Sequence, residues 1–164
     1  MTKHVPGAEL AEAVERSVPG SVAEVQPQGV VIQAESIRAV AAFLRDDPGF
    51  AFDFLASLTA VDYLDYFEVV YHLTSLTHNH SAVLKTRAYG RSAPAVPSVV
   101  AVWRGADFQE REAWDLMGVR FEGHPDLKRI LMYEPFEGHP LRKDFLEFDH
   151  RTLAASAEAA VEDR

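Results

Sequence analysis

The sequence predicts an α+β fold, a two-layer domain in which helices cover a mainly antiparallel sheet, followed by an extended C-terminal arm. Apolar residues recur at helical spacing in residues 8–17, which indicates an amphipathic helix. Three later segments, 50–61, 67–73 and 81–88, have the composition of strands and are joined by short turns, which favours an antiparallel meander. After Gly118, prolines and glycines separate the apolar residues, so neither a long helix nor a regular strand is expected there.

Helical spacing and chain-terminating residues define the elements of the first third of the chain. The expected elements are a helix over 8–17 that ends at Pro19-Gly20, strands over 21–26 and 30–33 joined by Pro27-Gln28-Gly29, and a second helix that follows Ser36 and stops at residues 46–49. Serine favours the N-cap because its hydroxyl accepts a hydrogen bond from a free N–H of the first turn. These helices would cover one face of the sheet.

Two further helices are expected after the strands. Residues 90–97 read as a linker, Ser98 as the cap of a short third helix that contains Val99 and Trp103, and Asp107 as the cap of a helix that ends at Met117. The next residue is a glycine, which commonly terminates a helix. The boundary between the domain, residues 1–118, and the arm with its tail, residues 119–164, is placed there.

Composition limits the possible functions. A chain of 164 residues that is 48% hydrophobic and 25% charged is typical of one globular domain. The chain contains no cysteine, so it is not expected to hold an iron–sulfur cluster, a disulfide or a thiol nucleophile. Its formal net charge of −9 argues against a nucleic-acid surface. No apolar run reaches about 18 residues and no secretory signal is present, so we expect no membrane span and a cytoplasmic chain.

The last predicted helix carries a dense group of charges, Glu110, Arg111, Glu112 and Asp115. A carboxylate pair for proton transfer is one interpretation of this pattern. The other is a salt-bridged helix that docks on a partner, with Arg111 and Asp115 paired at i, i+4 spacing. Charged helix faces usually have no further role than this, so the sequence favours the structural interpretation.

A short repeat follows that helix, because Phe-Glu-Gly-His-Pro occurs at 121–125 and again at 136–140. Two histidines and two glutamates could form a metal site. Glycine and proline around His124 and His139 are better explained by tight turns in which each ring hydrogen-bonds locally. The sequence therefore predicts bracing histidines and no metal ligands.

The rest of the arm combines apolar and basic residues. Lys128, Arg129, Arg142 and Lys143 alternate with apolar side chains such as Leu131 and with acids. This mixture suits an extended segment that docks on another protein, and we expect it to become ordered only when that protein is present. No glycine-rich phosphate loop follows a strand, so NADH or FMN binding is not expected.

Residues 109–145 as a whole resemble the signature of the hydrophilic C subunit of respiratory complex I, the proton-pumping NADH:quinone oxidoreductase. The matching elements are Glu110-Arg111-Glu112, Asp115-Leu116-Met117-Gly118, His124-Pro125, Leu127-Lys128-Arg129-Ile130-Leu131 and Gly138-His139-Pro140-Leu141-Arg142-Lys143-Asp144-Phe145. So many specified positions at fixed offsets are very unlikely to match by chance.

The resemblance implies a structural subunit of the peripheral arm without catalytic, cofactor-binding or metal-binding residues of its own. FMN and iron–sulfur clusters would lie in partner subunits. The partners would be the quinone-site D subunit, the cluster-bearing B subunit and the ferredoxin-like I subunit, at the cytoplasmic face of the cell membrane. The candidate interface residues are Glu110, Arg111, Glu112, Asp115, His124, Lys128, Arg129, His139, Arg142, Lys143 and Phe145.

Two alternatives remain open at this point. The chain could be the equivalent subunit of a related complex, either a ferredoxin-fed photosynthetic complex or a membrane-bound hydrogenase. It could also be a stand-alone metal-dependent hydrolase built on the repeated Glu and His residues.

Overall fold

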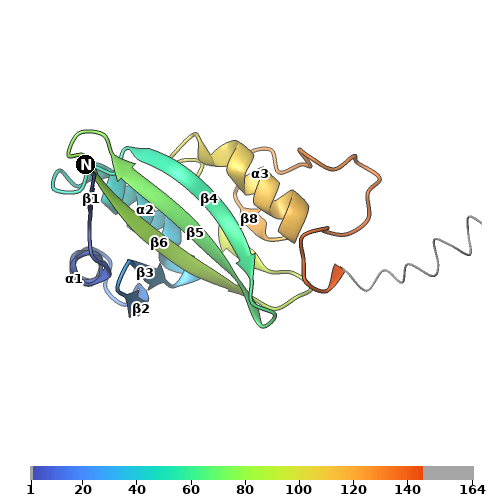
Figure 1. Ribbon diagram of the computed structural model, residues 1–164, viewed down its shortest axis with the longest axis horizontal. Coiled ribbons are helices and arrows are strands. Elements are labelled where there is room, and N and C mark those ends of the chain that lie inside the picture. The colour runs from blue at the N-terminus through green and yellow to red at the C-terminus, as the bar shows by residue number, and fades with distance from the viewer. Residues whose placement is uncertain (1, 146–164) are drawn as a thin grey trace, which may run out of the picture.

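The computed structural model describes residues 2–145 of the chain. The elements are β1 (Lys3–His4), α1 (Gly7–Ser17), β2 (Val22–Gln26), β3 (Gly29–Ile32), a 3-10 turn (Ala34–Ser36), α2 (Ile37–Asp46), β4 (Phe54–Asp62), β5 (Tyr66–Ser75), β6 (His80–Tyr89), β7 (Ala95–Pro97), α3 (Ala106–Met117) and β8 (Arg120–Glu122). Figure 1 shows the long strands β4 to β6 side by side, with α3 beyond them near the C-terminal segment.

The main sheet is predominantly antiparallel, as the sequence predicts. Its strand order is β2-β3-β6-β5-β4, and β1 also pairs with β6. The β2–β3, β6–β5 and β5–β4 pairs are antiparallel, whereas β3 and β1 run parallel to β6. The expected meander is therefore confirmed for β4, β5 and β6.

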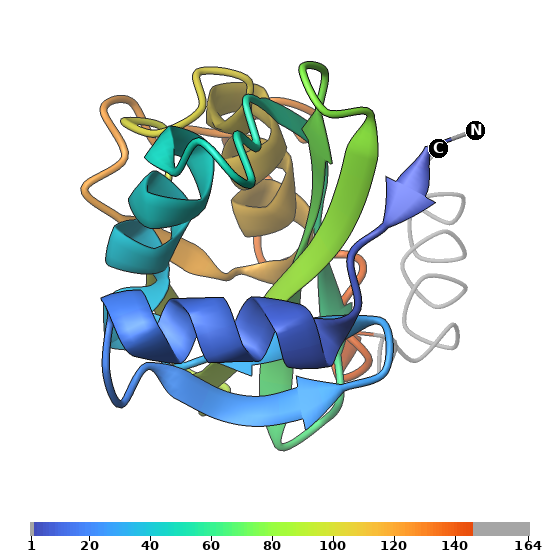
Figure 2. The same ribbon diagram turned by 90° about the vertical axis from the view of Figure 1, so that its left-hand side faces the viewer.

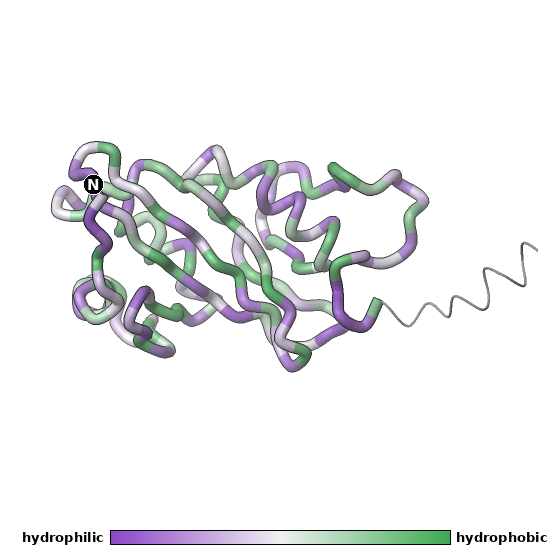
Figure 3. The backbone as a smooth tube through the Cα atoms, in the orientation of Figure 1, coloured by the Kyte–Doolittle hydropathy of each residue, from purple (hydrophilic) through white to green (hydrophobic). Residues whose placement is uncertain are grey.

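The helices form the second layer, on one side of the long strands (Figure 2). Alternate residues of β5, among them Phe67, Val69, Tyr71 and Leu73, are buried in a single core with apolar residues of α1, α2 and α3. This alternation is what a strand covered on one face requires. The tube coloured by hydropathy shows the same mixture of polar and apolar residues along the strands (Figure 3). No helix within residues 2–145 combines the length and apolar content needed to cross a membrane.

The strand expected from Phe50 begins only at Phe54. The Asp47 carboxylate accepts hydrogen bonds from the N–H groups of Gly49, at 2.8 Å, and Phe50, at 3.2 Å. Ala51 then adopts a positive φ of 45°, which is uncommon outside glycine. The chain therefore turns before it becomes extended.

The short third helix expected after Ser98 does not form. The segment is a turn, in which the N–H groups of Val102 and Trp103 both bond to the Val99 carbonyl. The N–H of Val99 is taken by the side chain of Glu110, and the Trp103 indole donates to the Phe52 carbonyl at 2.8 Å. These two contacts with other parts of the chain fix the turn in place of a helix.

The expected linker and the first residues of the expected arm each form a short strand. β7 lies within residues 90–97 and pairs in parallel with β8. β8 lies just after residue 118, so the chain leaves the domain only after Glu122. Of the tail, residues 146–164 lie outside the described part of the chain.

Candidate docking site

The best-defined polar site centres on the carboxylate of Asp115, in the last turn of α3. Asp115 is fully buried, and its Oδ2 accepts hydrogen bonds from the N–H groups of Ile130 at 3.0 Å, Leu131 at 2.8 Å and Met132 at 2.9 Å. Its Oδ1 accepts one from Arg129 at 2.6 Å. Burial opposes the charged form, but these donors outweigh it and lower the pKa of Asp115 to about 2.

Arg129 extends this site to the next turn of the arm. Its Nη2 donates to the carbonyls of Phe136, at 2.8 Å, and Gly138, at 3.1 Å. Its guanidinium also lies 5.8 Å from the ring centroids of Trp114 and Phe136. One buried ion pair therefore holds a stretch of chain that has no secondary structure of its own.

The two histidines of the repeat brace the same segment against α3. The His124 ring donates to the carbonyl of Asp107, in the first turn of α3, at 3.1 Å, and its other nitrogen accepts from the N–H of Asp126 at 3.0 Å. The His139 ring donates to the carbonyl of Asp115, in the last turn, at 2.9 Å. Within residues 2–145 no group of three or more metal-ligating side chains converges. The histidines act as predicted for local bracing.

Gly118 lets His139 approach the end of α3. Its φ of 76° is in the left-handed region, and a Cβ built on Gly118 would lie 2.6 Å from a carbon of the His139 ring. Only glycine satisfies both requirements. The glycine that ends α3 therefore also leaves room for the ring of His139.

A second buried carboxylate holds the far end of the segment. Asp62, at the end of β4, accepts a bond from the N–H of Lys143 at 2.9 Å and forms an ion pair with Arg91. Arg91 also contacts Asp144 at 2.9 Å, and Arg142 donates to the carbonyl of Arg91 at 2.7 Å. Arg91 above all keeps the pKa of Asp62 well below its usual range.

These contacts correct one expectation. Residues 124–145, hereafter the strap, were expected to become ordered only on a partner. The structure instead fastens the strap to its own domain at Asp115, at the two histidines and at Asp62. The expectation failed because it considered the apolar residues of the strap and overlooked its backbone N–H groups.

The candidate interface residues divide into two groups. Fully or partly buried in the chain are Glu110, Arg111, Asp115, His124, Arg129, His139, Arg142 and Phe145, whereas Glu112, Lys128 and Lys143 are exposed. The expected i, i+4 pair of Arg111 with Asp115 does not form. Arg111 instead lies 3.9 Å from Asp107, one turn earlier on α3. The buried residues position the strap, and their role at a subunit interface stays a prediction.

Four apolar residues of the strap are exposed to solvent. The exposed fractions are 36% for Ile130, 56% for Leu131, 67% for Tyr133 and 56% for Leu141. Phe108 of α3, which was not among the candidate residues, is also exposed. Its position, two residues from the buried Ala106 and Glu110, already placed it off the buried face of the helix.

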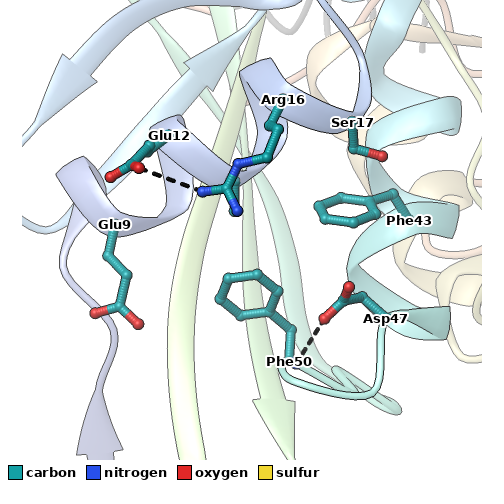
Figure 4. Close-up of a pocket in the computed structure, with 8 residues that line it drawn as sticks. Glu9, Glu12, Arg16, Ser17, Phe43, Asp47 and Phe50 are labelled. Atoms are coloured by element: carbon teal, nitrogen blue, oxygen red, sulfur yellow. Dashed lines mark hydrogen bonds and ion pairs between the residues drawn. The ribbon is translucent and has the colours of Figure 1, made fainter.

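The groove between α1 and α2 has a volume of about 430 Å³ (Figure 4). Its charged residues are largely engaged with their neighbours: Arg16 pairs with Glu12 at 3.3 Å, and Asp47 bonds to the backbone of Phe50. The rings of Phe43 and Phe50 meet edge to face. The polar groups of this groove that have partners therefore find them within the chain.

A third buried acid, Glu110, lies in the middle of α3. Its Oε1 accepts a bond from the N–H of Val99 at 2.7 Å. Burial outweighs this bond and the influence of Ser98 and Arg38, and it raises the pKa of Glu110 to about 7. Unlike Asp115, this carboxyl is only partly satisfied.

Comparison with known proteins identifies similar chains. Residues 30–150 match the model of the family described as respiratory-chain NADH dehydrogenase, 30 Kd subunit. The chain is 46% identical over 138 residues to the C subunit of the NADH-quinone oxidoreductase of Roseiflexus sp. (strain RS-1), and the match covers 82% of this chain and 79% of the relative. It is 45% identical over 142 residues to the C subunit of the same enzyme from Parvibaculum lavamentivorans, with 85% and 70% covered.

One solved structure has the same fold. A chain of the membrane-bound sulfane sulfur reductase, an archaeal respiratory membrane complex, superposes with a TM-score of 0.71. The match covers 92% of this chain and 90% of the other at 24% identity. At that identity, the likeness shows a shared fold.

Asp115→Asn should release the strap. The amide oxygen can still accept from the three backbone N–H groups, but the amide NH2 then faces Arg129, which loses both its acceptor and its counter-charge; losing one partner of a buried pair costs about 3–5 kcal/mol. Hydrogen exchange should show that the amides of residues 130–132 lose protection. Asp126→Asn is the matched control, because its pair with Lys128 is exposed to solvent and contributes little to stability. Unchanged protection in Asp115→Asn would refute the anchoring role.

Glu110 should make the chain less stable as the pH rises. Its folded pKa of about 7 exceeds the ordinary 4.5, so the folded state retains a proton that the unfolded state loses. The contribution of Glu110 to stability should be largest below pH 4.5, fall by about 3 kcal/mol up to pH 7 and then level off.

Glu110→Gln should remove this dependence and be the more stable variant at pH 8. Denaturant titrations at pH 5 and pH 8 measure it, with the exposed Glu112→Gln as the control on the same helix. Parallel losses of stability in the Glu110→Gln variant and the unaltered chain would contradict the assignment.

Proposed function

Because the chain belongs to the family of the 30 Kd subunit of the respiratory-chain NADH dehydrogenase, we propose that it is a structural subunit of the peripheral arm of a proton-translocating NADH:quinone oxidoreductase. The complex oxidises NADH, reduces quinone and moves protons. The role of this chain is to hold the redox-active subunits in register, without catalytic residues of its own.

The observation that carries this proposal is the construction of the strap. Its polar backbone is bound to Asp115 and Asp62, while Leu131, Tyr133 and Leu141 are exposed. A segment fixed in this way loses little conformational freedom when a partner covers its apolar side chains. Exposed apolar residues on rigid supports are typical anchors of a protein interface.

The partners that we propose are the quinone-site D subunit, the cluster-bearing B subunit and the ferredoxin-like I subunit. FMN and the iron–sulfur clusters would reside in partner subunits, since the chain has no cysteine to ligate a cluster. In this arrangement the chain lies peripherally at the cytoplasmic face of the cell membrane.

The comparisons favour this function over the two alternatives. The cited relatives, at 45–46% identity, are C subunits of NADH-quinone oxidoreductases, whereas the likeness to the sulfane sulfur reductase concerns the fold. A metal-dependent hydrolase would need His124 and His139 as ligands, and both rings are bound to carbonyls of α3. We therefore keep the proposal that the chain is a subunit of the respiratory complex.

Leu131→Asp should impair assembly and leave the fold intact. The side chain is exposed and makes no core contact, so the melting temperature of the isolated chain should stay close to that of the unaltered protein. Burying an aspartate in the interface should reduce the amount of chain in the purified complex by about tenfold or more.

Leu76→Asp is the matched control for this experiment, because Leu76 is 70% exposed in the turn between β5 and β6, away from the strap. The control should assemble normally. Equal assembly of both variants would rule out the strap as the docking element.

The isolated chain should carry no redox centre. Anaerobic reconstitution with iron and sulfide, followed by absorption and paramagnetic resonance spectra, should give a colourless and silent protein. A cluster with stoichiometric iron would show that the chain takes part in electron transfer, against the structural role.

A further inference from the structure

Three buried side-chain polar atoms have no hydrogen-bond partner within residues 2–145. One is the hydroxyl oxygen of Ser21, and the other two are Oε2 of Glu110, on α3, and the hydroxyl oxygen of Tyr71, on β5. The side chains of Glu110 and Tyr71 are both completely buried. Such atoms are rare in native proteins because each unsatisfied group costs about 1–3 kcal/mol.

The Glu110 and Tyr71 side chains lie between the same helix and strands. Tyr71 points into the core between Leu58 and Leu84, its neighbours on the flanking strands. The N–H of Leu58 donates to the side chain of Gln109, which precedes Glu110 on α3, and α3 packs across β4. In keeping with this placement, burial raises the pKa of the Tyr71 hydroxyl and the charge of Glu110 raises it further. The phenol and the carboxyl make no direct hydrogen bond.

We propose that one buried water molecule binds between Glu110 and Tyr71 and joins the carboxyl oxygen to the phenol. Tyr71 can donate its hydroxyl proton to the water, and the water can donate to Oε2 of Glu110. Buried waters typically occupy polar sites of this kind, where two or more protein groups would otherwise lack partners.

A water molecule suits this site better than a fixed donor. An ionised Glu110 requires a donor opposite Oε2, whereas a protonated Glu110 requires an acceptor. A water molecule can reorient to donate to the ionised form of Glu110 or to accept from the protonated form. The other groups that influence this carboxyl are Ser98, Arg38 of α2 and Asp107 of α3.

The bridge would fix how α3 lies on the sheet. Glu110 already holds the turn at Val99 through Oε1, so the water would add a link from the same carboxyl to strand β5. Asp115, which anchors the strap, is on the same helix. The bridge is a property of the chain itself and does not depend on the proposed function.

A crystal structure of the unaltered chain at high resolution tests the proposal directly. The expected result is one density peak within hydrogen-bonding distance of both Glu110 Oε2 and the Tyr71 hydroxyl. A direct contact between the two side chains, or an empty site, would overturn it.

Tyr71→Phe gives an independent test, because the direction in which the melting temperature changes distinguishes a bridged hydroxyl from an unpartnered one. If the hydroxyl is bridged, its removal should lower the melting temperature by about 2–4 °C. If the hydroxyl is unpartnered, its removal should leave the melting temperature unchanged or raise it, which would contradict the bridge. Tyr133→Phe, at an exposed tyrosine, is the control and should have no effect.

Discussion

The buried carboxylate of Asp115 is the contact on which the shape of the strap depends. It converts a segment without helix or strand into a defined structure, because three consecutive backbone N–H groups and one guanidinium converge on it. A buried charge is tolerated only when its hydrogen-bonding capacity is filled. The strap and α3 therefore depend on each other. The strap supplies the N–H groups and the guanidinium that Asp115 needs, and Asp115 supplies the acceptor that these donors need.

The strap reverses the usual arrangement of a protein surface. Its polar groups face the domain, and several of its apolar side chains face outward. In an isolated protein this would leave apolar area in water without benefit. In a member of a family of respiratory-chain subunits it is the arrangement expected where another chain completes the packing.

Much of the domain could be predicted from the sequence, because helices and half-buried strands repeat their apolar residues with fixed periods. Two of the failures have a common cause. The turn at Val99 depends on Glu110, and the shape of the strap depends on Asp115, which lies 15–17 residues from its backbone partners Ile130 to Met132. A carboxylate that binds backbone N–H groups at such separations leaves no periodic signal, so in the sequence it looks like part of a charged surface.

The order of the anchors along the chain bears on how the protein is made. Asp62 and Asp115 are synthesised before the residues of the strap that bind them, since Arg129 to Lys143 emerge later from the ribosome. Asp62 can already pair with Arg91 at that stage, whereas Asp115 lacks all four of its donors until residues 129–132 have been made. The strap can therefore close only after its own residues have been synthesised, against a helix and a strand that precede it in the chain.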